Sequence, residues 1–374
     1  MNNLTMLLTG DLILDEPEPD MFFDAARATL RAAGLVIGHV EVPHTLRGTE
    51  GSADVPAPAA RPAHLAALAR AGFHVATLAG NHIYDQGPAG VADTIATLRE
   101  HGLQTTGAGM NLDEARAPAV IDRHGVRVGA LSYNCVGPRD SWAGAKKAGC
   151  AYVHVITHYE LNYASPGGPP TIYTFAEPVT LEAMQADIET LRAQVDVLAV
   201  AFHKGIAHTP AVIAMYERQV AKAAIEAGAD IVIGHHAHIL RGIEVYKGKP
   251  VFHGLGNFVT VTRALSVENN ASPARLAWAK RRRELFGFAP DPDYPTFPFH
   301  PEAKNTILAF CEVSKNGVVR AGFIPCWIHP RGAPEPLGNN ERGRAVADYV
   351  AQITRKAGLN ANFGWDGDRV VIES

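Results

Sequence analysis

The chain has 374 residues, of which 47% are hydrophobic and 19% are charged, and its formal net charge is −4. This is the composition of a globular protein with ample apolar material for a core, and its slight acidity argues against a nucleic-acid-binding surface. The basic run at residues 280–283 is interpreted as the solvated face of a helix, because Glu284 follows it and apolar residues are interleaved.

Cysteine usage and apolar runs set further limits. Cys135, Cys150, Cys311 and Cys326 show neither C-x-x-C spacing nor the density of a disulfide-stabilised fold. No apolar run approaches the roughly 20 residues of a membrane-spanning helix, and no basic segment precedes an apolar one at the N-terminus. We therefore expect buried free thiols, no contact with a membrane and a cytoplasmic location.

Helical and strand-like segments alternate along the chain. A strand is expected at residues 4–8, and a helix at 22–33 leads through Gly34 to a strand at 35–37. Further helix and strand pairs are expected at 63–71 with 75–78, 181–193 with 195–202, and 212–227 with 229–233. The remaining elements are a helix at 91–101, β-rich segments at 105–109, 119–121 and 126–133, a β-hairpin at 306–324 and a helix at 342–357. This alternation is typical of α/β layers.

Two segments interrupt the alternation. Residues 138–178 and 260–304 are long and rich in proline and aromatic residues. We expect both to be insertions that line the substrate crevice and set substrate choice. No internal repeat and no linker is evident, so residues 1–374 are expected to form a single domain.

Polar residues suited to metal binding lie where several of these apolar runs end. They are Asp11, Glu41, Asn81, His203, His236 and His238. The carboxyl ends of strands in an α/β sheet converge on one crevice, and carboxylate, amide and imidazole groups are common ligands of divalent metals. The positions therefore predict a metal centre at one edge of a sheet.

Each of these residues also has a simpler explanation. His236 and His238 would suit a histidine-rich surface loop, and Asp11 would suit a turn or a helix N-terminus. Glu41 lies in the apolar run 36–42, where an unpaired carboxylate would be costly unless it faces the surface.

His82 follows Asn81 and is a candidate catalytic acid or oxyanion-binding imidazole. Asp85, three residues later, is suited to orient His82, and equally to begin the next helix.

Six segments together resemble the poly-γ-glutamate capsule protein (CapA) family, which is related to the calcineurin-like metallophosphoesterases. They are TGD at 9–11, VE at 40–41, GNHIYDQG at 80–87, HKG at 203–205, GHHAH at 234–238 and GLGNF at 254–258. The resemblance implies a four-layer α/β/β/α sandwich with one or two metals between the loops of its sheets.

The resemblance also implies roles for individual residues. Asp11 and His238 would bind one metal, and Glu41 would bridge. The second metal would be bound by Asn81, His203 and His236. His82 would lie close to the leaving group.

The chain departs from the related families at three places. Ile13 stands where metallophosphoesterases have a ligand histidine, so the resemblance leaves open whether one or two ions bind. His39 stands where the CapA pattern has asparagine, and it is a candidate substitute ligand or substrate contact. Lys204 replaces a tryptophan and is expected either to contact an anionic substrate or to lie at the surface. His208 and Arg241 are expected to line the pocket.

We therefore expect a hydrolase that uses one or two divalent transition-metal ions, Mn, Zn or Fe, to activate water. The chain has neither a G-x-S-x-G nucleophile elbow nor a Walker-type phosphate loop. The favoured substrate is a small organic molecule, aromatic or anionic, that is cleaved at a C–N or C–O bond. Phosphoester hydrolysis and a non-catalytic role in polyglutamate binding or capsule assembly are the alternatives. The small molecule is the expected partner, nucleic acid and membrane are not, and homo-oligomer formation is left open.

Overall fold

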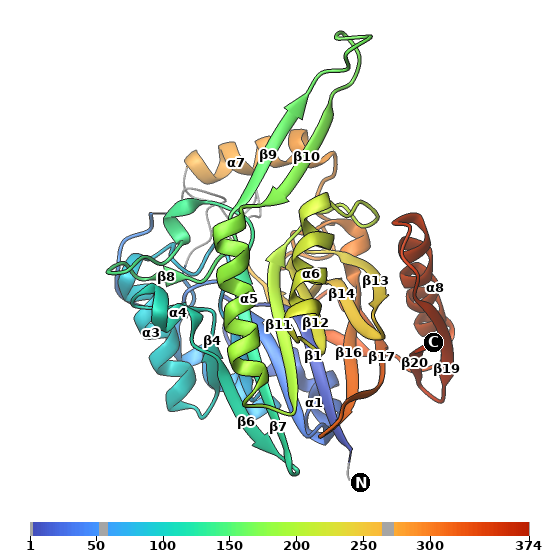
Figure 1. Ribbon diagram of the computed structural model, residues 1–374. Coiled ribbons are helices and arrows are strands. Elements are labelled where there is room, and N and C mark those ends of the chain that lie inside the picture. Colours follow the sequence, from blue (N-terminus) through green and yellow to red (C-terminus); the bar gives the residue numbers. More distant parts are fainter. Residues whose placement is uncertain (1–2, 52–58, 264–272, 374) are drawn as a thin grey trace.

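The computed structural model describes residues 3–51, 59–263 and 273–373 (Figure 1). Two large β-sheets lie face to face within this part of the chain, and helices cover their outer faces. The four-layer α/β/β/α sandwich predicted from the sequence is confirmed.

The larger sheet has ten strands. Its main path is β19 (Asn362–Asp366), β20 (Arg369–Glu373), β17 (Gly317–Ile328), β16 (Asn305–Ser314), β1 (Leu4–Leu14), β2 (Leu35–Val40), β3 (Val75–Thr77) and β4 (Gln104–Thr106). Off this path, β15 (Asn257–Val261) pairs with β1, and β18 (Pro334–Pro336) pairs with β17. Because β1 to β4 are mutually parallel, their carboxyl ends lie at one edge.

The second sheet has six strands. Their order is β13 (Leu240–Tyr246), β14 (Lys249–Leu255), β12 (Ile231–His236), β11 (Val197–Lys204), β7 (Val126–Asn134) and β6 (Ala119–Arg123). The strands β7, β11, β12 and β14 are parallel. Their carboxyl ends meet those of the larger sheet, since the backbone N–H of His236 donates to Asp11 Oδ2 at 3.2 Å.

Helices bury the outer face of each sheet. On the larger sheet lie α1 (Asp24–Ala32), α2 (Ala66–Ala71) and α3 (Gly87–Glu100), and on the second lie α5 (Pro178–Arg192) and α6 (Met215–Ala227), which Figure 1 shows in front of β7, β11 and β12. A third apolar cluster fills the space between the sheets, and α8 (Glu341–Lys356) adds Val346 and Val350 to it. Short helices complete the fold: η1 (Pro19–Phe23), η2 (Pro62–Leu65), α4 (Leu112–Arg116), η3 (Arg139–Ser141) and η5 (Pro301–Lys304).

Strand β1 is longer than the sequence pattern indicates. The expectation that it ends at Leu8 is wrong, because the strand continues to Leu14. Its first half pairs with β16, and its register shifts near Asp11, where β15 becomes its neighbour. A Cβ atom at Gly10 would lie 2.1 Å from the carbonyl oxygen of Gly256, so this close approach requires glycine. The irregularity places Asp11 inside the sandwich instead of in a loop.

Other boundaries move less. The strands β11 and β12 extend to Lys204 and His236, so two of the predicted ligands, His203 and His236, lie in the last residues of these strands. The hairpin predicted about residues 315–317 is confirmed as β16 and β17. The hairpin of β19 and β20 has no counterpart among the predicted elements.

Residues 138–178 contain a hairpin that projects from the body of the molecule (Figure 1). It consists of β9 (Val155–Glu160) and β10 (Thr171–Ala176), and Tyr159 and Tyr163 on it are 59% and 103% exposed. These aromatic residues are thus exposed on the hairpin, and the expected part of the segment in lining the crevice stays a prediction. Nearer its base, β8 (Gly149–Cys150) pairs with β5 (Ala108–Gly109), and Lys147 Nζ lies 3.9 Å from the centre of the Tyr84 ring.

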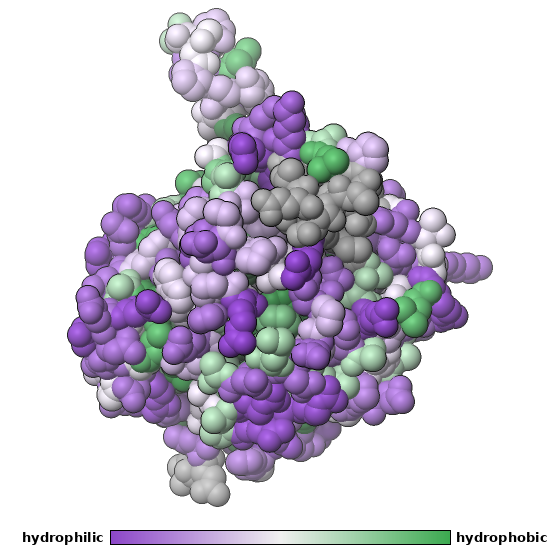
Figure 2. Space-filling model, turned by 180° about the vertical axis from the view of Figure 1, so that it is seen from behind, coloured by the Kyte–Doolittle hydropathy of each residue, from purple (hydrophilic) through white to green (hydrophobic). Residues whose placement is uncertain are grey.

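Residues 260–304 contain α7 (Pro273–Phe286) and the loop that follows it, and residues 264–272 lie outside the described part. The description of this segment and 138–178 as insertions in one domain stays a prediction. Figure 2 shows a largely hydrophilic surface with small apolar patches on the face opposite to that of Figure 1. All four cysteines are buried and free, as predicted. None of the described helices is both long and apolar enough to span a membrane.

Candidate metal centre

The predicted ligands come together where the strand ends of the two sheets meet. Asp11 and His39 lie on β1 and β2, and His203 and His236 lie on β11 and β12. Glu41, Asn81 and His238 follow β2, β3 and β12. Asp11, Glu41 and His238 form one group of donors, and Asp11, His39 and His203 form another, with the ligand atoms of each group within 4.8 Å of one another.

The first group joins one imidazole to two buried carboxylates. His238 Nε2 lies 3.2 Å from Glu41 Oε1, and His238 Nδ1 lies 3.6 Å from Asp11 Oδ2. Asn257 Nδ2 donates to the His238 carbonyl, which turns its Oδ1 toward His238 Nδ1 at 3.0 Å. The Nδ1 proton of His238 is therefore committed to Asn257. If the ring is neutral, Nε2 carries a lone pair that points at a lone pair of Glu41, and the two repel each other. The contact is therefore favourable only if a second proton or a cation lies between the two atoms.

The electrostatics of this group show an excess of negative charge. Burial, reinforced by Glu41, raises the pKa of Asp11 well above its usual value. Burial acts to lower the pKa of His238, but Glu41 and Asp11 outweigh it and raise that pKa to about 9. Burial acts to raise the pKa of Glu41, and His238 brings it down to about 2. A divalent cation would compensate the same charge.

His203, which belongs to the second group, also contacts Asn81 and His236, and hydrogen bonds alone do not satisfy these two contacts. His203 Nε2 lies 2.8 Å from Asn81 Oδ1 and 3.2 Å from His236 Nδ1. Burial and neighbouring histidines, His39 first, lower the pKa of His203 well below its usual value, so the ring is neutral. In either neutral tautomer only one of the two contacts is a hydrogen bond. Ligands about 2.1 Å from one ion lie about 3–3.5 Å apart, so the 3.2 Å between His203 Nε2 and His236 Nδ1 suits two ligands of a shared metal, and Asn81 Oδ1 lies slightly closer to His203.

Buried donor atoms without partners support the same conclusion. Within the described residues, no hydrogen-bond partner is found for Asp11 Oδ1, His39 Nε2 or His203 Nδ1, nor for either carboxylate oxygen of Glu41 beyond its ion pair with His238. Leaving such a group buried and unpaired costs ~1–3 kcal/mol if it is neutral and more if it is charged. The residues therefore fit one or two divalent transition-metal ions.

His39 takes a place that the sequence left open. His39 Nδ1 contacts Thr77 Oγ1 at 3.1 Å, and that hydroxyl lies 3.4 Å from the Gly38 carbonyl oxygen. If the hydroxyl donates to Gly38, His39 Nδ1 donates to Thr77 and Nε2 is free to bind a metal. Ile13 is buried in an apolar cluster with Phe297. His39 thus offers a further imidazole nitrogen beside Asp11 and His203, whereas Ile13 offers no ligand.

The backbone of the GHHAH segment is strained at its ligands. His236 and His238 have φ values of 87° and 53°, in the left-handed region that non-glycine residues rarely adopt. Strain of this kind costs on the order of 1–3 kcal/mol per residue and concentrates at functional sites. The ring of His236 contacts His203, and the ring of His238 contacts Glu41 and Asp11.

His82 and Asp85 lie next to each other beside the ligands. His82 Nδ1 lies 2.7 Å from Asp85 Oδ2, and both side chains are buried. His82 is also near enough to Glu41 for its charge to help lower the pKa of that carboxyl, after the larger effects of burial and His238. Asp85 is thus placed to fix the orientation of the His82 ring, as expected from the sequence.

The expected substrate-binding roles of Lys204 and Arg241 are corrected by the structure. Both side chains are fully buried and pair with Glu217, with Lys204 Nζ 3.3 Å from Oε2 and Arg241 Nη2 3.0 Å from Oε1. Lys204 also contacts His253 Nδ1 at 3.1 Å. Successive residues of a strand face opposite ways, so Lys204 points to the helix layer while His203 points between the sheets.

His208 lies at the edge of the centre, and its expected place in a substrate pocket stays a prediction. Its ring centre is 6.0 Å from that of His238 and 4.9 Å from those of Phe286 and Phe288. The ring centre of Phe299 lies 4.8 Å from that of His238. Aromatic residues of the segment 260–304 therefore lie against this side of the metal centre.

Three residues in or beside the metal centre were given no role of their own in the sequence analysis. Asn257 orients His238, and His235 Nε2 donates to the Thr9 carbonyl while its ring stacks 4.7 Å from that of His39. Asn257 and His235 lie in the segments GLGNF and GHHAH that carry the family resemblance, and nothing else in the sequence indicated their roles. Arg282 contradicts the interpretation of its basic run as a solvated face, since it is buried while Arg281 and Arg283 are exposed.

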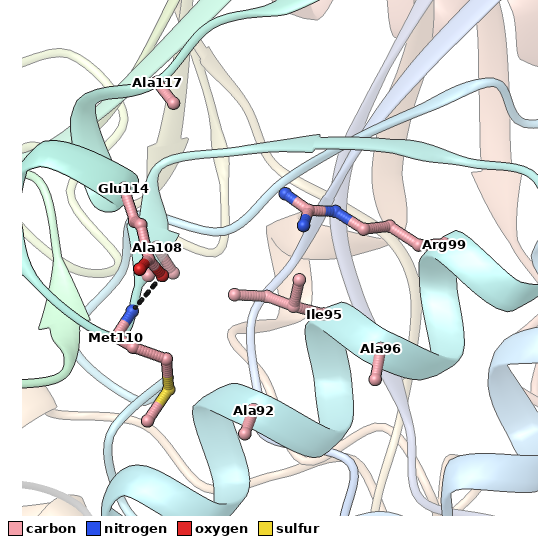
Figure 3. Close-up of a pocket in the computed structure, with 9 residues that line it drawn as sticks. Ala92, Ile95, Ala96, Arg99, Ala108, Met110, Glu114 and Ala117 are labelled. Carbon is pink, nitrogen blue, oxygen red and sulfur yellow. Dashed lines mark hydrogen bonds between the residues drawn. The ribbon is translucent and has the colours of Figure 1, made fainter.

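A separate hollow of about 310 Å³ lies between α3 and the start of α4 (Figure 3). Its lining is mainly Ala92, Ile95 and Met110, with Arg99 and Glu114 as its charged residues. Glu114 accepts hydrogen bonds from the Met110 backbone and the Asn111 side chain. The hollow holds none of the predicted ligands.

The chain matches the family model described as bacterial capsule synthesis protein PGA_cap over residues 5–262. It is 29% identical over 268 residues to the capsule biosynthesis protein CapA of Bacillus anthracis, covering 68% of this chain and 59% of that protein. It is 28% identical over 255 residues to the PGA biosynthesis protein CapA of Bacillus subtilis, covering 66% and 58%. The chain thus spans less than two thirds of the length of these curated relatives. The calcineurin-like phosphoesterase YfkN of Bacillus subtilis aligns over 95% of this chain and 97% of its own, with 13% identity and a TM-score of 0.42.

Proposed function

The chain belongs to the PGA_cap family of bacterial capsule synthesis proteins, and from this premise we propose that it is a metal-dependent hydrolase acting on a small organic substrate. The family resemblance inferred from the sequence is thereby confirmed, whereas the reaction is our proposal. The observation that carries it is the pair of buried donor groups around Asp11, Glu41 and His203.

The proposed roles divide the donors between two positions. Asp11, Glu41 and His238 would hold one ion. Asn81, His203 and His236 would hold the other, with His39 available as a further nitrogen donor. When bound, such ions supply Lewis acidity and lower the pKa of a bound water toward neutrality.

The remaining chemistry is supplied by the protein. The Asp85 carboxylate accepts a hydrogen bond from His82 Nδ1–H and so fixes the orientation of the ring. His82 would donate a proton to the leaving group, and Asn257 keeps the Nε2 atom of His238 directed at Glu41.

The bond to be cleaved is inferred from the surroundings of the centre. The aromatic side chains Phe286, Phe288 and Phe299 beside His208 and His238 favour an organic substrate with an apolar body. We therefore propose a C–N or C–O bond, and phosphoester cleavage is the alternative. Mixed nitrogen and oxygen donors suit Mn, Zn and Fe alike.

A panel of chromogenic substrates tests this proposal. Protein loaded separately with Mn, Zn or Fe(II) would be assayed on aryl esters, anilides and aryl phosphates. We expect turnover of at least one ester or anilide that disappears after chelation and in Asp11→Ala. Turnover of aryl phosphates alone would establish the phosphoesterase alternative. Metal-loaded protein that cleaves none of the three classes would contradict the proposal.

The names of the Bacillus relatives support a second candidate, a non-catalytic role in capsule assembly or PGA binding. Binding of γ-linked glutamate oligomers without turnover by metal-loaded protein would favour it. The cytoplasmic location, self-association, and the absence of nucleic-acid and membrane partners stay predictions.

A further inference from the structure

Arg282 is a buried cation without a matching anion. It is 5% exposed, although it belongs to α7, whose neighbouring residues Arg281 and Arg283 are exposed. Within the described part of the chain no hydrogen-bond partner is found for Arg282 Nη1. Burial lowers the pKa of Arg282 to about 10, and no acidic neighbour offsets that effect among the described residues. A buried charge of this kind requires a partner.

The surroundings of Arg282 place it beside the metal centre. Its guanidinium carbon lies 5.5 Å and 5.8 Å from the ring centres of Phe288 and Phe299. Arg282 Nη2 lies 3.5 Å from His208 Nε2. Both His208 and Phe299 contact His238, which is a proposed metal ligand with a side chain 15% exposed. The aromatic rings orient the guanidinium, and Nη1 is buried among them with its hydrogen-bonding capacity unused.

We propose that Arg282 is the anion-binding residue of the substrate site and holds a carboxylate carried by an aromatic substrate next to the metal centre. This assignment rests on the hydrolase function proposed above and names the substrate class for it. The guanidinium would donate to the carboxylate, and the ring of the substrate would pack against Phe288 and Phe299.

The charge of the site favours a carboxylate over a phosphate. Within the described residues no second cation contacts the rings of Phe288 or Phe299. One guanidinium neutralises a singly charged carboxylate, whereas a phosphate monoester carries nearly two charges at neutral pH and would leave one of them buried.

Calorimetric titration of the metal-free protein tests the assignment, since a carboxylate cannot then bind through a metal. The probes are benzoate, the neutral benzamide and phenylphosphonate. We expect wild type to bind benzoate more tightly than both others. Arg282→Met should weaken benzoate binding by about tenfold or more and leave benzamide binding unchanged. Arg283→Met, which removes the same charge from an exposed position on the same helix, should bind benzoate like wild type.

Several results would overturn the assignment. These are no preference of wild type for benzoate over benzamide, equal benzoate affinity in Arg282→Met, an equal loss in Arg283→Met, or tighter Arg282-dependent binding of phenylphosphonate. Circular dichroism would show whether Arg282→Met is folded, and Arg282→Gln, which keeps a polar donor, replaces it otherwise. The wild-type comparison needs no variant at all.

The outcome is separable from that of the proposed function. Arg282-dependent benzoate binding by a protein that retains no metal would preserve the anion site and refute the hydrolase. Metal-dependent hydrolysis in a protein whose benzoate affinity is unchanged by Arg282→Met would support the hydrolase and refute the anion site.

Discussion

His82 shows how one residue can take part in turnover without holding a metal. It lies beside Glu41 and is oriented by Asp85. We expect His82→Ala to keep its metal and to lose about 10²–10⁴-fold in kcat, as for removal of a general acid. Asp85→Asn should lose about 10–100-fold, because it acts through the orientation of His82. Steady-state kinetics with elemental analysis of the same samples measures both. Full activity in His82→Ala would remove it from the mechanism.

His238 makes metal binding depend on pH. Its pKa is about 9 without an ion, so below that pH it carries a proton that an incoming ion must displace. The sign is therefore fixed: metal affinity should fall as pH falls from about 9, and about one proton or more should be released per ion at neutral pH. Calorimetry in buffers of different ionisation enthalpy counts these protons. An affinity that does not change between about pH 6.5 and 8.5 would contradict the assignment of His238 as a ligand.

Residue types and their order were enough to predict most of the candidate site. Acids and histidines after apolar runs pointed to the donors that the fold brings together. The failures share a physical cause, since they depend on which way a side chain points. Lys204 and His203 point to opposite faces of the sheet because successive residues of β11 alternate in direction. Arg282 is buried and Arg283 is exposed because of the way in which α7 packs. Neither orientation can be predicted without knowing which elements are neighbours.

At the scale of elements, α6 is joined to the second sheet by a buried charge network. Glu217 on α6 pairs with Lys204 of β11 and Arg241 of β13, and all three side chains are inaccessible to solvent. This network holds the strand whose preceding residue, His203, is a proposed ligand.

Removing the acid from this network should be costly. We expect Glu217→Gln to lower the free energy of unfolding by about 3–5 kcal/mol, because two cations stay buried without a carboxylate. Glu226→Gln on the same helix is the control, since Glu226 pairs with Lys247 at the surface and little change is expected. Urea denaturation of the two variants measures the difference. Equal stabilities would show that the network does not stabilise the fold.

The layered arrangement of elements followed from apolar periodicity and glycine caps. The continuation of β1 past Asp11 did not, because it depends on pairing with β15, about 246 residues later in the chain. The hairpin of β9 and β10 was also missed, since its sequence was interpreted as part of a pocket wall.

At the scale of the whole molecule, the metal centre and the projecting hairpin are separate features. The centre takes its donors from strands and loops of both sheets, and the hairpin supplies none of the proposed ligands (Figure 1). Replacing residues 158–173 by a two-glycine turn should therefore leave metal content and thermal stability nearly unchanged. Elemental analysis and a thermal melt check this. Loss of metal in the shortened chain would show that the hairpin supports the centre.

The central claim is that the two sheets bring together a metal-binding site. Elemental analysis of protein purified without chelator tests it most directly, on wild type, His236→Ala and the exposed control His101→Ala. We expect about one or two transition-metal ions per chain in wild type and in the control, and a clear loss in His236→Ala. No bound metal in any of the three, even after reconstitution with Mn, Zn or Fe(II), would contradict the account.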